Sequence, residues 1–198
     1  MAKAIDVSSH FPTSGRSLSQ PDELRVLIKE CIASSRVSQK KLYDIYSPAA
    51  YGIVRKYIHN NEQIAMELLN EAFFKVFRDL HQYSFQGAFE GWIRKIVVHT
   101  VSDYLRKNMK VERMTREVQP EDAYVNSEPV SNMSHKELLA LIETLPDAQR
   151  NIFNLFVFEN YSHKEIAKML DMKQNNCRWH LNDARRRLKE KINALVNK

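Results

Sequence analysis

The amino-acid sequence predicts an all-α protein with two helical domains joined by a flexible linker. Apolar residues recur at the spacing of amphipathic helices, no segment has a convincing strand pattern, and the helical period fades once, in mid-chain. The 198 residues are 43% hydrophobic with only four glycines, which provides apolar material for two small cores. We therefore expect helical domains at 21–107 and 134–198, a flexible leader at 1–20 and a linker at 108–133.

Four amphipathic segments make up the first domain, an N-terminal bundle of antiparallel helices. Their apolar positions are Leu24, Leu27, Ile28, Cys31 and Ile32; Leu42, Ile45, Tyr46, Ala49, Ile53 and Tyr57; Ala65, Leu69, Ala72, Phe73, Val76, Phe77 and Leu80; and Phe89, Trp92, Ile93, Ile96, Val97, Val101, Tyr104 and Leu105. Pro48 either bends the second helix or marks a helix start. A glycine-punctuated loop at 81–87 separates the third helix from the fourth.

Residues that start and stop helices divide the second domain into four short helices. Pro146 is expected to end the first helix, and Asp147 to cap a second helix that runs through Phe158. A capping box of Ser162 and Glu165 is expected before the third helix. Asn175 or Asn176 is expected to cap a last helix that runs to about Val196. The stretch between the two domains has prolines and acidic residues but no apolar period, which is typical of a linker.

Positive charge is concentrated in two separate blocks. Residues 94–116 hold 7 Lys/Arg against 2 Asp/Glu, residues 173–198 hold 8 against 2, and residues 117–172 between them hold 4 against 10. Clustered cations bind polyanions because neutralised phosphates release counterions. The pattern predicts two contacts with a nucleic acid, although solvated helix faces explain the same charge without a ligand.

Several classes of protein are disfavoured by what the sequence lacks. No apolar run is long enough to insert into a membrane, and two cysteines are too few for a disulfide scaffold, so we expect a cytoplasmic protein. A carboxylate metal site built from Glu62, Glu67, Glu71 and His81 would need Glu-x-x-His pairs, and none occurs. Phosphate-binding loops and nucleophile elbows are also missing. We expect no enzyme activity, no cofactor and no metal.

The strongest local motif is a helix-turn-helix at 162–188, with a short capped helix, a turn and a longer basic helix. An α-helix fits the major groove, where Asn pairs with adenine and Arg with guanine. The last helix has a buried stripe of Cys177, Leu181, Ala184, Leu188 and Ile192, opposite a face of Asn175, Asn176, Trp179, Asn182, Asp183 and Arg186. Trp179 is expected either on this DNA-reading face or against the preceding helix.

Two sets of residues, in this order along the chain, resemble conserved regions of bacterial sigma factors. The first set resembles region two: Glu67 to Phe73, then Phe85, Gly87, Phe89, Trp92, Ile93, Lys95, Ile96, Asp103, Tyr104 and Arg106. The second resembles region four: Leu145, Pro146, Arg150, Phe153, Ser162, Glu165, Ile166, Ala167, Ala184, Arg185 and Leu188. The chain is similar to extracytoplasmic-function sigma factors of the sigma-70 family, which carry these two regions only.

This resemblance implies an RNA polymerase sigma factor that binds core polymerase and directs promoter-specific initiation. The residues implied to dock on the β′ clamp helices are Glu67, Asn70, Glu71, Phe74 and Lys75. Those implied at the minus-ten element, where a base is flipped and the DNA melts, are Tyr83, Phe85, Arg94, Lys95, His99, Arg106 and Lys107. Those implied at the minus-thirty-five element are Asn176, Arg178, Trp179, His180, Asn182 and Arg186. The second domain is also implied to meet the β flap.

The residues implied at the minus-ten element include side chains that suit an unstacked base. Unstacked bases need aromatic and polar partners, which Tyr83, Phe85 and His99 offer, although for Phe85 a core position is favoured. Some positions depart from the family pattern, with Asn160 where a glycine is frequent and Asp183 where a basic residue is frequent. A dimeric helix-turn-helix regulator that acts without core polymerase is the alternative, and an anti-sigma partner is left open.

Overall fold

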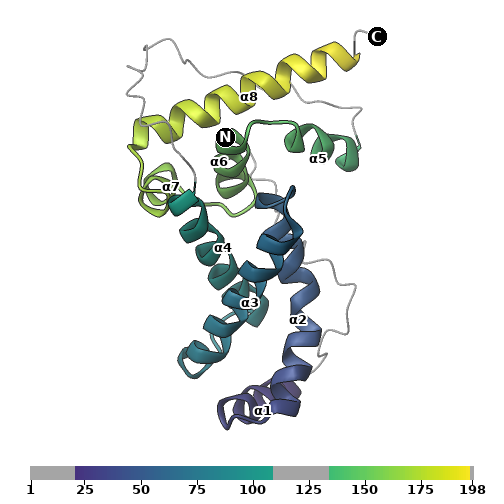
Figure 1. Ribbon diagram of the computed structural model, residues 1–198, viewed down its shortest axis with the longest axis vertical. Helices are drawn as coiled ribbons and strands as arrows, with labels where there is room; N and C mark the ends of the chain where they lie inside the picture. The colour runs from purple at the N-terminus through teal and green to yellow at the C-terminus, as the bar shows by residue number, and fades with distance from the viewer. Residues whose placement is uncertain (1–20, 109–133, 197–198) are drawn as a thin grey trace. The chain divides into compact units, whose positions relative to one another are not determined.

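The computed structural model describes residues 21–108 and 134–196, and within these ranges every regular element is helical, as the sequence predicts (Figure 1). The expected leader at 1–20 and nearly all of the expected linker at 108–133 lie outside the described residues. The chain divides into two compact units, Met1–Val101 and Ser102–Lys198. None of the described helices combines the length and the apolar character needed to cross a membrane.

The first group contains four α-helices and a short 3₁₀ helix. They are α1 (Pro21–Ile32), α2 (Arg36–Tyr57), α3 (Glu62–Asp79), η1 (Leu80–Gln82) and α4 (Phe89–Asn108). Two side-chain caps fix helix starts: the Ser35 hydroxyl accepts from the Ser38 amide at 3.3 Å, and the Asn61 side chain accepts from the Ile64 amide at 3.0 Å. The α2 helix runs without interruption through Pro48, so this proline does not mark a helix start.

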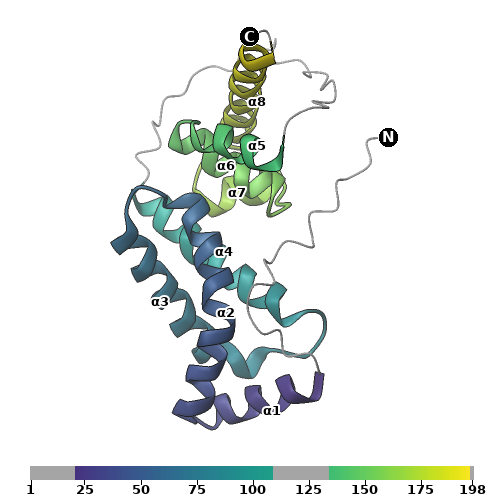
Figure 2. The same cartoon turned by 90° about the vertical axis from the view of Figure 1, so that its right-hand side faces the viewer.

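The α1 helix departs from the expected antiparallel arrangement. Figures 1 and 2 show that it lies across one end of α2. The corner between them is tight, with Ser34 at a φ of 65°. Polar contacts hold it: the Ser38 hydroxyl donates to the Glu30 carboxylate at 2.6 Å, and the Gln39 amide donates to the Cys31 carbonyl at 3.2 Å. Because this short connection and its contacts set α1 across the end of α2, the two helices do not pack side by side as an antiparallel pair.

The core of the first group comes mostly from the predicted apolar stripes, although Val54 lies outside the predicted set and Ile32, which belongs to it, is exposed. Ile28, Leu42, Val54, Val76 and Ile93 are all essentially inaccessible to solvent. Burying an aliphatic side chain of this size contributes about 1.5–3 kcal/mol to folding. At one end the core is aromatic, because the Tyr46 ring of α2 packs edge-on against Phe89 at 5.2 Å.

The second group contains α5 (His135–Glu143), α6 (Asp147–Val157), α7 (His163–Met169) and α8 (Gln174–Val196). The capping box of Ser162 and Glu165 is confirmed at the start of α7. Ser134 and Glu137 form a second box at the start of α5, which the sequence analysis did not predict.

Two predicted caps in this group are wrong. Asp147 is the first residue of α6 and not its cap, because Pro146 holds the N-cap position. Asn175 and Asn176 lie inside α8, which begins at Gln174, since the amides of Asn176 and Cys177 already bond to the Lys173 carbonyl. The predicted end of this helix at about Val196 is confirmed, so α8 with its 23 residues is close to the expected length.

The core of the second group joins α8 to the helices beneath it. Ile142, Leu145, Ala184 and Leu188 form one buried cluster, and Phe153 and Phe158 pack against it. Cys177 is also buried on this side of α8, and burial raises the pKa of its thiol to about 11. Burial likewise raises the pKa of the Cys31 thiol in α1 to about 11. Both cysteines are therefore protonated at neutral pH and serve as small apolar core residues.

Two residues in left-handed backbone conformation flank α7, Asn160 with a φ of 57° and Asp171 with a φ of 53°. Asparagine tolerates this conformation, which accounts for Asn160 at a position where the resemblance described above leads to the expectation of glycine. We expect Asp171→Gly to stabilise the second group by about 0.5 kcal/mol and Asp171→Val to destabilise it by about 1–2 kcal/mol, because only glycine has no side-chain clash there. Urea denaturation checks this, and equal effects of the two substitutions would contradict it.

Candidate nucleic-acid and polymerase interface

The outer side of α3 gathers all five residues predicted to contact polymerase. Glu67, Asn70, Glu71, Phe74 and Lys75 recur at three- and four-residue intervals, which places them on one side of the helix. We call this surface the α3 face. All of its residues are exposed except Lys75, which is partly buried. The Phe74 side chain is 67% exposed, the second most exposed of the large hydrophobic residues in the described part of the chain.

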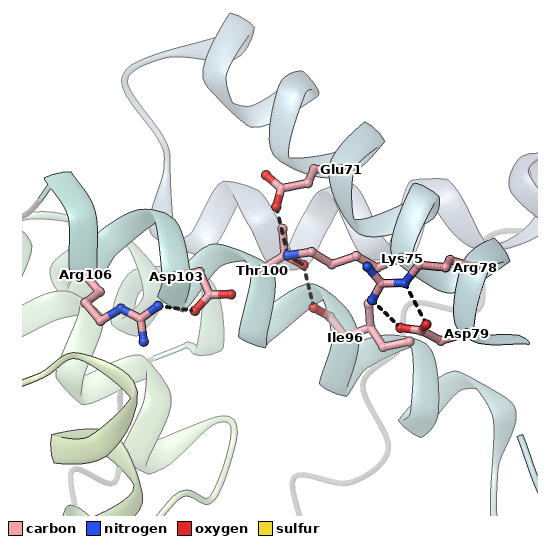
Figure 3. Close-up of polar contacts among 8 residues, drawn as sticks. All are labelled: Glu71, Lys75, Arg78, Asp79, Ile96, Thr100, Asp103 and Arg106. Atoms are coloured by element: carbon pink, nitrogen blue, oxygen red, sulfur yellow. Dashed lines mark hydrogen bonds and ion pairs between the residues drawn. The ribbon is translucent and has the colours of Figure 1, made fainter. Parts of the chain in front are cut away.

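Polar contacts tie part of the α3 face to α4 (Figure 3). The Lys75 ammonium pairs with the Glu71 carboxylate at 2.8 Å and donates to the Thr100 hydroxyl of α4 at 3.1 Å. The Thr100 hydroxyl in turn donates to the Ile96 carbonyl at 2.9 Å. Lys75 therefore links α3 to α4, in addition to any role on the surface. Phe74, next to Lys75 in the sequence, leaves an apolar side chain exposed to water.

The loop before α4 is built around Tyr83, whose side chain is buried. A ring that stacks on a base has to be exposed, so Tyr83 does not offer such a surface. Its hydroxyl donates to the Gly87 carbonyl at 2.8 Å, and its ring packs against Phe89 at 4.9 Å and Trp92 at 5.6 Å. Burial is the main reason why the pKa of Tyr83 is raised. The ring is drawn inward because its hydroxyl finds a partner within the loop, so Tyr83 supports the loop from inside.

Phe85 lies in the same loop, two residues after Tyr83. It is partly buried, its φ is 58°, and its ring lies 5.0 Å from that of Tyr83. The guanidinium carbon of Arg25, from α1, lies 4.7 Å from the centre of the Phe85 ring. Arg25 was missed by sequence reasoning, because nothing in the sequence connects the first helix to this loop.

The outward side of α4 carries part of the cationic set predicted for the minus-ten element. Lys95, His99 and Arg106 are exposed and lie on one side of the helix, at intervals of four and seven residues. Arg106 pairs with Asp103 at 2.9 Å (Figure 3). Arg94, which is partly buried, and Lys107, which is exposed, lie on other sides of α4, so the structure does not bring the whole predicted set onto one face.

The helix-turn-helix consists of α7 and α8, and the predicted buried stripe of α8 is confirmed. Cys177, Leu181, Ala184 and Leu188 are buried, and Ile192 is partly buried. On the other side, Arg178 is exposed and Asn182, one turn further, is partly exposed. Asn176, Trp179 and His180 are partly buried, and the Trp179 and His180 rings contact each other edge to face at 4.9 Å.

Asp183 was expected on the exposed face of α8, and this expectation is wrong. Its side chain is only 7% exposed and accepts hydrogen bonds from Gln149 of α6 at 3.0 Å and from Arg187 at 2.8 Å. Arg186 also donates to it. Burial by itself raises the pKa of the Asp183 carboxyl, but the hydrogen bonds from Arg187, Arg186 and Gln149 outweigh it and leave the pKa below its ordinary value.

The three successive arginines of α8 therefore differ in their surroundings. Arg186 and Arg187 both pair with Asp183, and Arg186 pairs with Glu190 as well, at 2.7 Å. Arg185 instead lies over the Phe156 ring of α6 at 5.6 Å. The pKa of the nearby His163 is lowered by burial and by the charges of Arg178 and Arg185, so the field at this end of the helix-turn-helix is positive.

Comparisons with known proteins match a family model to helices of each group. Residues 42–111 match the family model for Sigma-70 region 2, and residues 135–188 match the one for Sigma-70, region 4. Together the two matches cover more than half of the chain.

In the part that the structure describes, no three His, Cys, Asp or Glu side chains gather as they would around a metal ion.

Several bacterial proteins are similar over most of the chain. The ECF RNA polymerase sigma factor SigM of Bacillus subtilis is 25% identical over 165 residues, which are 79% of this chain and 96% of SigM. The ECF RNA polymerase sigma-E factor of Escherichia coli K12 is 24% identical over 165 residues, 77% of this chain and 85% of that protein. Among solved structures, CnrH in complex with the cytosolic domain of CnrY is 14% identical with a TM-score of 0.45, covering 86% of this chain and 97% of CnrH. Both sigma-70 regions are matched in order along the chain, and SigM and the sigma-E factor, which align over most of it, are ECF sigma factors. The chain therefore belongs to the extracytoplasmic-function sigma factors of the sigma-70 family.

Proposed function

We propose that this sigma factor docks on core RNA polymerase through the α3 face, captures the minus-ten element with the 81–87 loop and α4, and reads the minus-thirty-five element with α8. The observation that carries the proposal is the combination of an exposed Phe74 on region two with a cationic helix-turn-helix on region four. The polymerase supplies all of the chemistry, so the chain acts in the cytoplasm without a catalytic site or cofactor of its own.

The α3 face has the composition of a protein-binding surface. An aromatic side chain surrounded by charged residues is typical of the centre of an interface, where burial of the ring provides most of the affinity. The charges of Glu67 and Glu71 favour a basic partner surface, which we propose to be the β′ clamp helices. Asn70 accepts a bond from Tyr43 at 3.4 Å, which orients its amide at the edge of this surface.

Promoter opening is proposed to occur at region two. Flipping a base costs a few kcal/mol of stacking and pairing, and this cost is offset by contacts in the protein. Phe85 offers a ring for stacking, while Lys95, His99 and Arg106 offer cationic and polar groups along α4, flanked by Arg94 and Lys107. Tyr83 is proposed to contribute only by fixing the loop, since its ring is buried.

Sequence reading is proposed to occur on α8. Arg178 and Asn182 face the same side one turn apart, and such side chains pair bidentately with guanine and adenine. Arg186 lies one further turn along the same side of α8, but its guanidinium has to break its ion pairs with Asp183 and Glu190 before it can reach a base. Asn176, Trp179 and His180 are proposed to belong to the same DNA-reading surface, at positions where their side chains are partly buried.

Two further partners belong to the proposal. Region four is proposed to meet the β flap of the polymerase, and an anti-sigma factor is proposed to hold the chain inactive. The structure of the sigma factor RpoE of Bartonella quintana has been determined in complex with the anti-sigma factor NepR, and we propose a partner of this class for the present chain. A dimeric regulator that works without polymerase is not favoured, because it gives no reason for the match to region two.

Run-off transcription with purified core polymerase and genomic fragments tests this function. We expect discrete transcripts that depend on the chain, and we expect the double substitution Arg178→Ala with Asn182→Ala to reduce them about 10–100-fold while core binding is unchanged, because each good base pairing contributes about 1–3 kcal/mol of discrimination. Lys136→Ala on α5 removes one charge from an exposed position outside the helix-turn-helix and serves as the control. A chain that binds DNA but gives no transcript with any core enzyme would refute the proposal.

A further inference from the structure

Arg25, in the first helix, lies at the loop proposed to capture a minus-ten base, yet none of the roles assigned above includes it. We propose that Arg25 and Phe85 form a two-part clamp for one unstacked nucleotide of single-stranded promoter DNA. In this clamp the Phe85 ring stacks on the base, and the Arg25 guanidinium pairs with the phosphate of the same nucleotide. The inference rests on the proposed function and names a new residue within it.

The first support for the clamp is the approach of two segments that are distant in sequence. Because α1 lies across the end of α2 (Figure 2), it contacts η1 at the start of the capture loop. This contact brings the guanidinium carbon of Arg25 to 4.7 Å from the centre of the Phe85 ring. The Arg25 side chain is exposed and Phe85 is partly exposed, so both groups are accessible from solvent.

The second support is the backbone of Phe85. A φ of 58° is unfavourable for a bulky side chain, and residues held in such conformations cluster at ligand-binding sites. The loop is held around it by the bond from the Tyr83 hydroxyl to the Gly87 carbonyl and by Gly87 itself, at a φ of 88°. The Phe85 ring is therefore a fixed platform, backed by Tyr83 at 5.0 Å.

The third support is the charge of Arg25, which no carboxylate within the described residues neutralises by an ion pair, in contrast to Arg78, Arg106 and Arg186. A cation over an aromatic face is attracted by the ring quadrupole, so Arg25 covers the ring when DNA is absent. An unstacked nucleotide offers a flat base and a negative phosphate. Its base takes the ring face, and the long, flexible arginine side chain moves to the phosphate, where a charge-assisted bond is stronger.

The clamp is tested on holoenzyme assembled from purified core polymerase and the full chain. The probe is a fork-junction fragment of a promoter that the wild-type holoenzyme opens, with 2-aminopurine in the single-stranded minus-ten segment. Arg25→Ala and Arg25→Gln are expected to weaken binding of this fragment about 10-fold, and to lower the slope of log affinity against log salt by about 0.7, the value for one phosphate contact on a single strand. Phe85→Leu is expected to abolish the stacking-dependent change in 2-aminopurine fluorescence, because leucine fills space without an aromatic face.

Lys29→Ala is the matched control, since it removes one exposed charge from α1 about one turn away from Arg25. It is expected to leave the affinity and the salt slope as in the wild type, and thermal melting shows that each variant is folded. Wild-type affinity and slope in both Arg25 variants, or tighter binding, would overturn the clamp while the sigma function stands. A wild-type holoenzyme that opens no promoter would overturn the proposed function itself, and the clamp with it.

Discussion

Phe74→Asp is expected to weaken the binding of this sigma factor to core RNA polymerase by about 30-fold or more, without unfolding region two. Burial of a phenylalanine side chain contributes about 1.5–3 kcal/mol, and an aspartate in its place would have to be desolvated at the interface. A loss of about 2 kcal/mol corresponds to this factor in affinity. Phe74 is 67% exposed in the free chain, so folding gains little from it and loses little by the substitution.

The measurement is fluorescence anisotropy of labelled sigma factor titrated with purified core enzyme. Val37→Asp is the matched control, because Val37 is an exposed apolar residue at the start of α2, 81% accessible and outside the α3 face. Glu71→Lys tests the charge of the same face and is expected to have a smaller effect, since exposed charges are screened by solvent. Equal affinity of the wild type and Phe74→Asp would show that the α3 face is not the docking surface.

The helices were largely predictable because each buries an apolar stripe that leaves a period in the sequence. Ala65, Leu69, Ala72 and Val76 are all buried as the spacing predicts. The first turns of α2 carry no such period. Residues 36–41 are mostly polar, and their helical state depends on the local cap at Ser35 and on the corner with α1, neither of which produces an apolar period.

Which of the predicted site residues share a surface was predictable only where spacing within one helix decides it. The α3 face follows from spacing within a single helix, and the structure gathers its five residues as expected. Contacts between elements were not predictable in this way. Tyr83 turned inward because its hydroxyl finds the Gly87 carbonyl, and Arg25 meets Phe85 only because α1 crosses the end of α2.

Asp183 shows the same limit most clearly. A helical projection of α8 places it among the exposed residues, but Gln149 lies 34 residues earlier in the chain and buries it from α6. Because its charge is paired with Arg186 and Arg187, Asp183 does not place an uncompensated negative charge on the proposed DNA-reading side of α8. It holds Arg186 and Arg187 in place, and so sets which arginine of α8 is available to phosphate.

Asp183→Asn is expected to reduce the free energy of unfolding of region four by about 2 kcal/mol at pH 7. The substitution leaves Gln149 and Arg187 facing a neutral amide, and hydrogen bonds to charged groups contribute about 1.5–3 kcal/mol each. Both arginines reach water, which limits the loss to less than that of a fully buried pair. Glu190→Gln is the control, because Glu190 also pairs with Arg186 but is 61% exposed, and we expect a change below about 0.5 kcal/mol.

The pH dependence of this difference identifies the Asp183 charge as its cause. The pKa of Asp183 is lowered in the folded chain, so its stabilisation is fully present above the ordinary aspartate pKa of about 3.9 and is lost as the pH falls through the folded value. Urea titrations followed by Trp179 fluorescence, with Trp92 replaced by Phe, should therefore give a constant difference between wild type and Asp183→Asn from pH 7 to 5 and a smaller one near pH 3. A difference that persists unchanged at pH 3 would mean that side-chain shape, and not charge, joins α6 to α8.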